Sequence, residues 1–133
     1  MRTPLSQAKS PQIRWTAAFT GFLVDYTITA LIVVFARPEE LFFTAPNLAN
    51  ATHLLYLALF TLSTGVGGYV AGRVARMHNV LHGLLVGVIG VLLSQVQLMS
   101  GGPTPPHAAV VASAVGCALG ALGGLISMHA NPK

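Results

Sequence analysis

Four apolar segments, each about as long as the helix that crosses a lipid bilayer, occupy most of this chain. They cover about 13–36, 52–72, 80–99 and 107–128 of the 133 residues. The connections between them are rich in Pro, Gly, Asn or charged residues, as loops are. The sequence therefore predicts an all-α integral membrane protein with a four-transmembrane-helix bundle at 13–129. Residues 1–12 and 130–133 are predicted to be tails.

The composition excludes most other classes of protein. Charged residues make up 8% of the chain and apolar residues 53%, and the mean hydropathy is +0.69. A soluble domain carries about 25% charged residues, so this chain has too little polar surface to face water on all sides. The net charge of +4 comes from scattered Lys and Arg residues, and no nucleic-acid-binding motif accompanies them. We therefore expect the lipid bilayer as a partner and no nucleic acid.

The distribution of Lys and Arg predicts the orientation. Four spans would place on one side of the membrane Arg2, Lys9, Arg14, Arg73, Arg76 and Lys133. Only Arg37, next to Glu39 and Glu40, would lie on the other side. By the positive-inside rule both termini are cytoplasmic, and the bias disfavours a dual topology. The first span is longer than a usual signal-peptide core and three more spans follow it, so we do not expect it to be cleaved.

Small residues recur every three or four positions in the last three spans. The stripes contain Thr64, Gly68 and Gly72 in the second span, Gly83, Gly87, Gly90 and Ser94 in the third, and Ala112, Gly116, Gly120 and Gly124 in the fourth. Apolar burial does not drive helices together in lipid, so close backbone approach over small residues contributes much of their association. The stripes predict tight helix packing, either within one bundle or between copies.

Asp25 is a single carboxyl group within the apolar run of the first span. At 1.5 Å per residue it lies about 16 Å beyond Arg14, near the middle of a hydrocarbon core about 30 Å thick. Ser63 and Thr64 fall at a comparable depth in the second span. An ionisable group at this depth is usually functional, which suggests a proton- or cation-responsive carboxyl. The alternative is a protonated or hydrogen-bonded Asp25 that joins helices as a polar contact.

Other candidate sites are weak. His78, His82 and His129 would lie on the cytoplasmic side, but no carboxylate or thiol is near them, so we predict no metal and no cofactor. Cys117 stands alone in an apolar stretch and is expected to act as a small packing residue. No nucleophile–base pair or phosphate-binding loop is present, and we expect no enzyme activity.

Residues 67–94, "GGYVAGRVARMHNVLHGLLVGVIGVLLS", resemble the YrzE-like small bacterial membrane proteins. The matching positions are Gly67, Gly68, Tyr69, Ala71, Arg73, Leu81, His82, Gly83 and Gly87. The resemblance implies four helices, no assigned activity and a place in the bacterial cell (inner) membrane. The chain is also similar to the small multidrug resistance transporters, which have four helices, an acidic residue in the first and a glycine-rich face in the fourth. Here that acid is Asp25 instead of Glu, and the charge bias differs from that of their antiparallel dimers.

Two functions remain open on the sequence. The first is a structural or accessory membrane subunit that packs with itself, as a homo-oligomer, or with a larger membrane complex. The second is a small proton-coupled transporter or channel with Asp25 as the coupling group. The second predicts a wet cavity beside Asp25, open to one side of the membrane.

Overall fold

The computed structural model describes residues 12–38, 47–101 and 106–130, apart from the side chains at 94, 97–101, 106–109 and 112. These residues form four helices: α1 (Trp15–Ala36), α3 (Ala51–Ala75), α4 (Asn79–Gly101) and α5 (Pro106–His129). For the residues that the structure describes, the prediction of an all-α fold is confirmed. The largest difference from the expected spans is at α3, which continues past Gly72 to Ala75.

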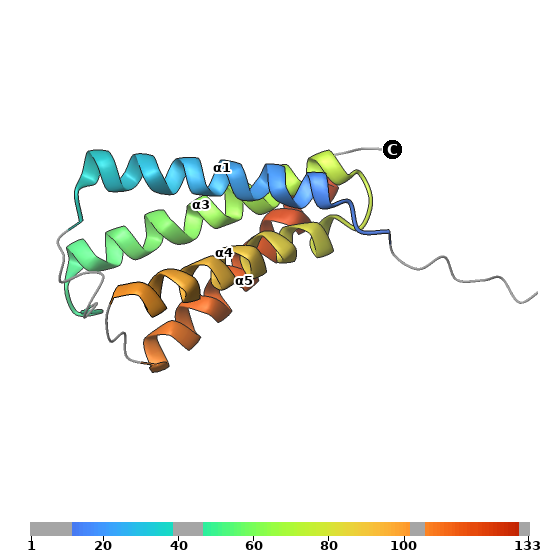
Figure 1. Ribbon diagram of the computed structural model, residues 1–133. Helices are drawn as coiled ribbons and strands as arrows, with labels where there is room; N and C mark the ends of the chain where they lie inside the picture. The colour runs from blue at the N-terminus through green and yellow to red at the C-terminus, as the bar shows by residue number, and fades with distance from the viewer. Residues whose placement is uncertain (1–11, 39–46, 102–105, 131–133) are drawn as a thin grey trace, which may run out of the picture.

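The helices lie side by side, and α3 contacts each of the other three. Figure 1 shows the start of α1, the end of α3, the start of α4 and the end of α5 at one end of the bundle. The contacts agree with this arrangement. The Arg14 guanidinium lies 3.5 Å from the carbonyl oxygen of Ala75, and the Arg73 guanidinium donates to the carbonyl oxygen of Ala130 at 2.6 Å.

The ends of α1 and α3 are set by local backbone geometry. Each helix is followed by an arginine in the left-handed conformation, Arg37 with φ 46° and Arg76 with φ 59°. Their N–H groups donate to the carbonyl oxygens of Val33 and Gly72, and each bond satisfies one carbonyl of the last turn. At the start of α3 the Asn50 side chain accepts from the N–H of Thr52 at 2.9 Å, which is an N-cap.

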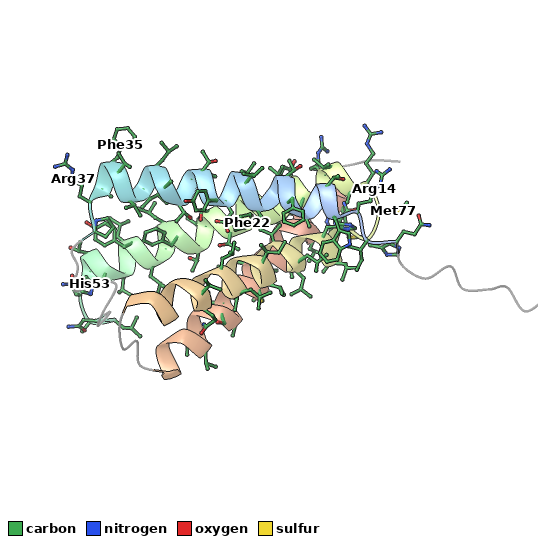
Figure 2. The ribbon with its side chains drawn as sticks, in the orientation of Figure 1. Arg14, Phe22, Phe35, Arg37, His53 and Met77 are labelled. Atoms are coloured by element: carbon green, nitrogen blue, oxygen red, sulfur yellow. The ribbon has the colours of Figure 1, made fainter. Side chains whose placement is uncertain are left out.

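The described arginines lie unequally at the two ends of the bundle. Arg14, Arg73 and Arg76 belong to the end at which α1 begins, whereas Arg37 follows α1 at the opposite end. Figure 2 shows Arg14 and Met77 at the first end, and Arg37, Phe35 and His53 at the second.

The interior is built from small residues, and the large apolar side chains point outward. The buried apolar residues are Ala17, Ala18, Ala71, Ala75 and Val86. In contrast, Phe35 of α1 is 81% exposed, Leu92 of α4 61% and Val110 of α5 67%. A helix of a soluble bundle places its apolar face inward, so this distribution suits apolar surroundings.

Helices α1 and α3 are long and apolar enough to cross a membrane. In the described parts of α4 and α5 the apolar stretches are shorter, Asn79–Leu93 and Ser113–His129. The structure therefore gives weak support for a membrane location through two helices. The four-span arrangement remains a prediction.

Candidate functional site

Asp25 lies on the face of α1 that points into the bundle. Ala17, Gly21 and Asp25 are four residues apart, which places them on one face of the helix, and all three are buried. Only 7% of Asp25 is exposed. The small residues before it allow α1 to approach α3 closely. The carboxyl group is thereby held in the interface between the two helices.

Three hydroxyl groups surround the carboxyl group. The Ser63 Oγ lies 2.6 Å from Asp25 Oδ1, and the Thr64 Oγ1 lies 3.4 Å from the same oxygen. The Thr29 Oγ1, one turn further along α1, lies 3.0 Å from the Ser63 Oγ. Ser63 also lies 2.7 Å from the carbonyl oxygen of Phe60 in its own helix. These contacts form a polar bridge between α1 and α3.

The other carboxyl oxygen faces α4. A Cβ placed on Gly90 would lie 3.9 Å from Asp25 Oδ2, so α4 passes the carboxyl group at ordinary van der Waals distance. Asp25 is thus enclosed by α3 on one side and by α4 on the other. The structure brings together Asp25, Ser63 and Thr64, which the sequence places at one depth. It adds Gly90 of α4 and also Thr29, which the sequence analysis missed. The signal for Thr29 was its position four residues after Asp25.

Most of the predicted packing glycines lie where two helix backbones meet. A Cβ on Gly68 would lie 2.9 Å from the Cα of Gly120, and a Cβ on Gly83 would lie 2.9 Å from the backbone nitrogen of Gly124. On Gly87 it would lie 2.7 Å from the Cα of Cys117. No side chain fits at such distances unless a helix moves. These contacts join α5 to α3 and to α4 within one chain.

Two predicted glycines differ from the others, and further close contacts involve residues outside the predicted set. A Cβ on Gly116 would meet nothing within 4 Å, and one on Gly90 would meet only the Asp25 carboxyl. Gly72 lies against the Ser127 side chain.

The sequence analysis missed two close glycine contacts. Gly21 contacts Gly67 between α1 and α3, and Gly123 contacts Gly65 between α5 and α3. Gly21 could have been found from its spacing to Ala17 and Asp25. Ser94 and Ala112 lie outside the side chains that the structure describes.

His82 is fully buried at the end of the bundle where α1 begins. Its Nε2 accepts from the backbone N–H of Arg14 at 2.9 Å, and its Nδ1 lies 3.0 Å from the carbonyl oxygen of His78. The first contact requires an unprotonated Nε2 and the second a protonated Nδ1, so the ring is the neutral Nδ1–H tautomer. Arg14 is the N-cap residue of α1, and its side chain makes no capping hydrogen bond. His82 therefore ties the start of α1 to α4.

His78, His82 and His129, which the sequence analysis considered together, all lie in the described part of the chain. No three His, Cys, Asp or Glu side chains gather there in a way that could hold an ion. His129 is exposed, and its Nδ1 lies 3.3 Å from the carbonyl oxygen of Leu125 in its own helix. Asn79 and Ser127 form a buried contact of 2.9 Å between α4 and α5. The Asn79 and Ser127 side chains thus act between helices, whereas His129 contacts only its own helix in the bonds described.

A known protein family matches most of this chain. No curated protein and no solved structure matches the chain. A family model described as "Protein of unknown function (DUF3792)" matches residues 14–127. The matched region begins just before α1 and ends within the last turn of α5, so it contains the Asp25 bridge and the glycine contacts. The chain belongs to this uncharacterised family, DUF3792.

Proposed function

We propose that this protein is a four-span membrane bundle of the bacterial inner membrane and serves there as a structural or accessory subunit. The span count rests on α4 and α5, which have 23 and 24 residues. At 1.5 Å per residue each is about 35 Å long, enough to cross a hydrocarbon core of about 30 Å. Their outward residues include exposed Val96 and Ile126, which suit contact with lipid.

The unequal arginines support the orientation. Arg14, Arg73 and Arg76 at one end would be cytoplasmic, and Arg37 would face the other side. Both termini would then be cytoplasmic. The similarity of residues 67–94 to YrzE-like membrane proteins agrees with this placement.

One observation carries the structural function: the Asp25 carboxyl group finds its partners on a neighbouring helix of the same chain. A buried polar group in a membrane stabilises a bundle when its hydrogen bonds cross between helices.

Two shallow depressions lie on the described surface. The first is on the outer face of α1 and is lined by Thr20, Leu23, Val24, Thr27 and Ile28. The second is near the start of α4 and is lined by His78, Asn79, Val80, Leu81 and, from α5, Met128. Asp25 is itself only 7% exposed, whereas a transporter would need access to it.

The glycine contacts add to this proposal. Gly68, Gly83, Gly87, Gly120 and Gly124 are engaged inside the bundle, so the large apolar side chains are left to face outward. A rigid bundle with an apolar exterior is suited to lateral association in the bilayer, with a second copy or with a larger membrane complex.

The test is to cross-link the protein in native membranes, isolate it through an affinity tag, and measure the masses of the products. A defined homo-oligomer, or a stoichiometric complex with another membrane protein, is the expected result. The rival function is a proton-coupled transporter. A pH-driven flux in reconstituted vesicles that disappears in a folded Asp25→Asn variant would overturn the structural proposal.

A further inference from the structure

The contacts around Ser63 require more hydrogen atoms than the hydroxyl groups supply. Ser63 Oγ lies 2.6 Å from Asp25 Oδ1 and 2.7 Å from the carbonyl oxygen of Phe60. The Phe60 oxygen can only accept, and an ionised Asp25 could also only accept. Ser63 has one hydrogen atom and would have to donate it to both. A shared hydrogen bond would lengthen both contacts, yet both have the distances of ordinary O–H···O bonds.

Thr29 does not remove the difficulty. Its hydroxyl group lies 3.0 Å from the Ser63 Oγ and can donate to Ser63, but it supplies no hydrogen between Ser63 and its two acceptors. Thr64 lies 3.4 Å from both Asp25 Oδ1 and the Phe60 oxygen and also has a single hydrogen. With an ionised Asp25, one of the short Ser63 contacts would join two oxygen atoms with no hydrogen between them.

A proton on Asp25 satisfies the three contacts of the Ser63 hydroxyl group. The acid O–H then donates to the Ser63 Oγ, and Ser63 donates to the Phe60 oxygen. Thr29 donates to Ser63, which would accept two hydrogen bonds and donate one, as a hydroxyl group can.

The surroundings offer no described cation to replace that proton. Arg14, Arg37, Arg73 and Arg76 lie at the ends of α1 and α3. On α3 the nearest titratable residue along the helix is Tyr69, about 8 Å beyond Thr64, and the others are Tyr56 and His53. On α4 it is His82, about 12 Å before Gly90. Tyr26, which follows Asp25 on α1, is 58% exposed and belongs to the outer surface.

We propose that Asp25, Ser63, Thr29 and the Phe60 carbonyl form a proton-binding site, in which a neutral Asp25 donates to Ser63 and closes α1 onto α3. Loss of the proton leaves Ser63 with two acceptors for one hydrogen, so one of its contacts must break. The polar bridge between α1 and α3 therefore depends on a bound proton. This inference is separate from the structural function, which requires only that the bridge exists.

The experiment uses the fact that Asp25 is the only aspartate in the sequence. Cell-free synthesis with aspartate carrying ¹³C at the side-chain carboxyl labels this group alone, without a substitution. The full chain is then reconstituted in phosphatidylcholine vesicles and its infrared spectrum is recorded at neutral pH. We expect the labelled carbon to absorb as a carboxylic acid. A carboxylate band at neutral pH would overturn the proposal, and the structural function would be unaffected.

A pair of variants tests the hydrogen-bond direction. Ser63→Ala removes the acceptor of the acid proton, so the labelled carboxylic acid band is expected to shift toward that of a less hydrogen-bonded acid. Thr27→Val is the matched control, because the Thr27 hydroxyl donates to the Leu23 carbonyl oxygen in its own helix and lies away from Asp25. An unchanged acid band in Ser63→Ala, or an equal shift in Thr27→Val, would contradict donation from Asp25 to Ser63.

Discussion

At the scale of single residues, Asp25 shows how a polar side chain can be held inside an apolar bundle. Its partners Ser63 and Thr64 come from another helix, and Thr29, from the next turn of α1, contacts Ser63. Interhelical hydrogen bonds in lipid contribute about 1–2 kcal/mol in model peptides and less in some proteins. The bridge therefore contributes modestly to stability, but it fixes which face of α1 meets α3.

A substitution pair at Asp25 separates hydrogen bonding from charge. Asp25→Asn retains a donor toward Ser63, so we expect its thermal unfolding midpoint in detergent at neutral pH to be close to that of the wild type. Asp25→Leu removes the carboxyl group, so the Ser63 and Thr64 hydroxyl groups lose their hydrogen-bond partner. We expect this loss to lower the free energy of unfolding by about 1–3 kcal/mol. Circular dichroism during heating would measure both. Equal destabilisation by Asn and Leu would show that the amide cannot replace the acid.

A comparison of the wild type with Asp25→Asn tests how stability depends on pH. If the bundle closes on a neutral Asp25, its contribution to stability is present while the proton is bound and is lost as the pH rises through the titration of this group. We expect the unfolding midpoint of the wild type to fall at alkaline pH relative to that of Asp25→Asn, whose amide keeps its hydrogens. If the unfolding midpoints of the wild type and Asp25→Asn change in parallel with pH, the bridge does not depend on a proton.

His82 offers a second test at this scale. His82→Ala would leave the Arg14 N–H without its acceptor and open a space at a fully buried position. A loss of about 2–4 kcal/mol is expected from the combination of an unmade hydrogen bond and a cavity. His129→Ala is the matched control, because His129 is exposed. Comparable losses of unfolding free energy for the two variants would refute the role of His82.

At the scale of helices, the sequence could predict the elements but only part of their contacts. Apolar length was sufficient for the four helices, and spacing was sufficient to propose Gly68, Gly83 and Gly120 as packing residues. Spacing could not reveal that Gly21 meets Gly67, because a contact between helices depends on how each is rotated about its axis. It also could not distinguish Gly116 from Gly120, which belong to one stripe.

Gly116 and Gly120 therefore form an internal comparison on α5. Gly120→Leu would drive a side chain into the backbone of α4 at Gly83 and Gly87, where the distances leave no room. We expect a large loss of thermal stability in detergent, or failure to fold. Gly116→Leu adds the same side chain one turn earlier, where a Cβ meets nothing within 4 Å, and is expected to be tolerated. If both variants behave alike, the close contacts of Gly120 do not hold the bundle together.

At the scale of the whole molecule, the arrangement of helices and the positions of arginine support the topology that we propose. The start of α1 and the end of α5 lie at the same end of the bundle, together with Arg14, Arg73 and Arg76. Positive charges near span ends are retained in the cytoplasm. The exposed apolar side chains between the two ends would then face lipid.

Cysteine labelling in intact cells and in inverted vesicles tests this topology. Cys117 is first replaced by Ala, which leaves a chain without cysteine. A cysteine at Thr44, which lies outside the described residues, is expected to react with a membrane-impermeant maleimide only from outside. A cysteine at Met77, between α3 and α4 and 45% exposed, is the matched position and is expected to react only in inverted vesicles. Reaction of Thr44→Cys from the cytoplasmic side would reverse the orientation. Reaction of both positions from the same side would rule out the membrane crossing by α3, because α3 is the helix that separates them.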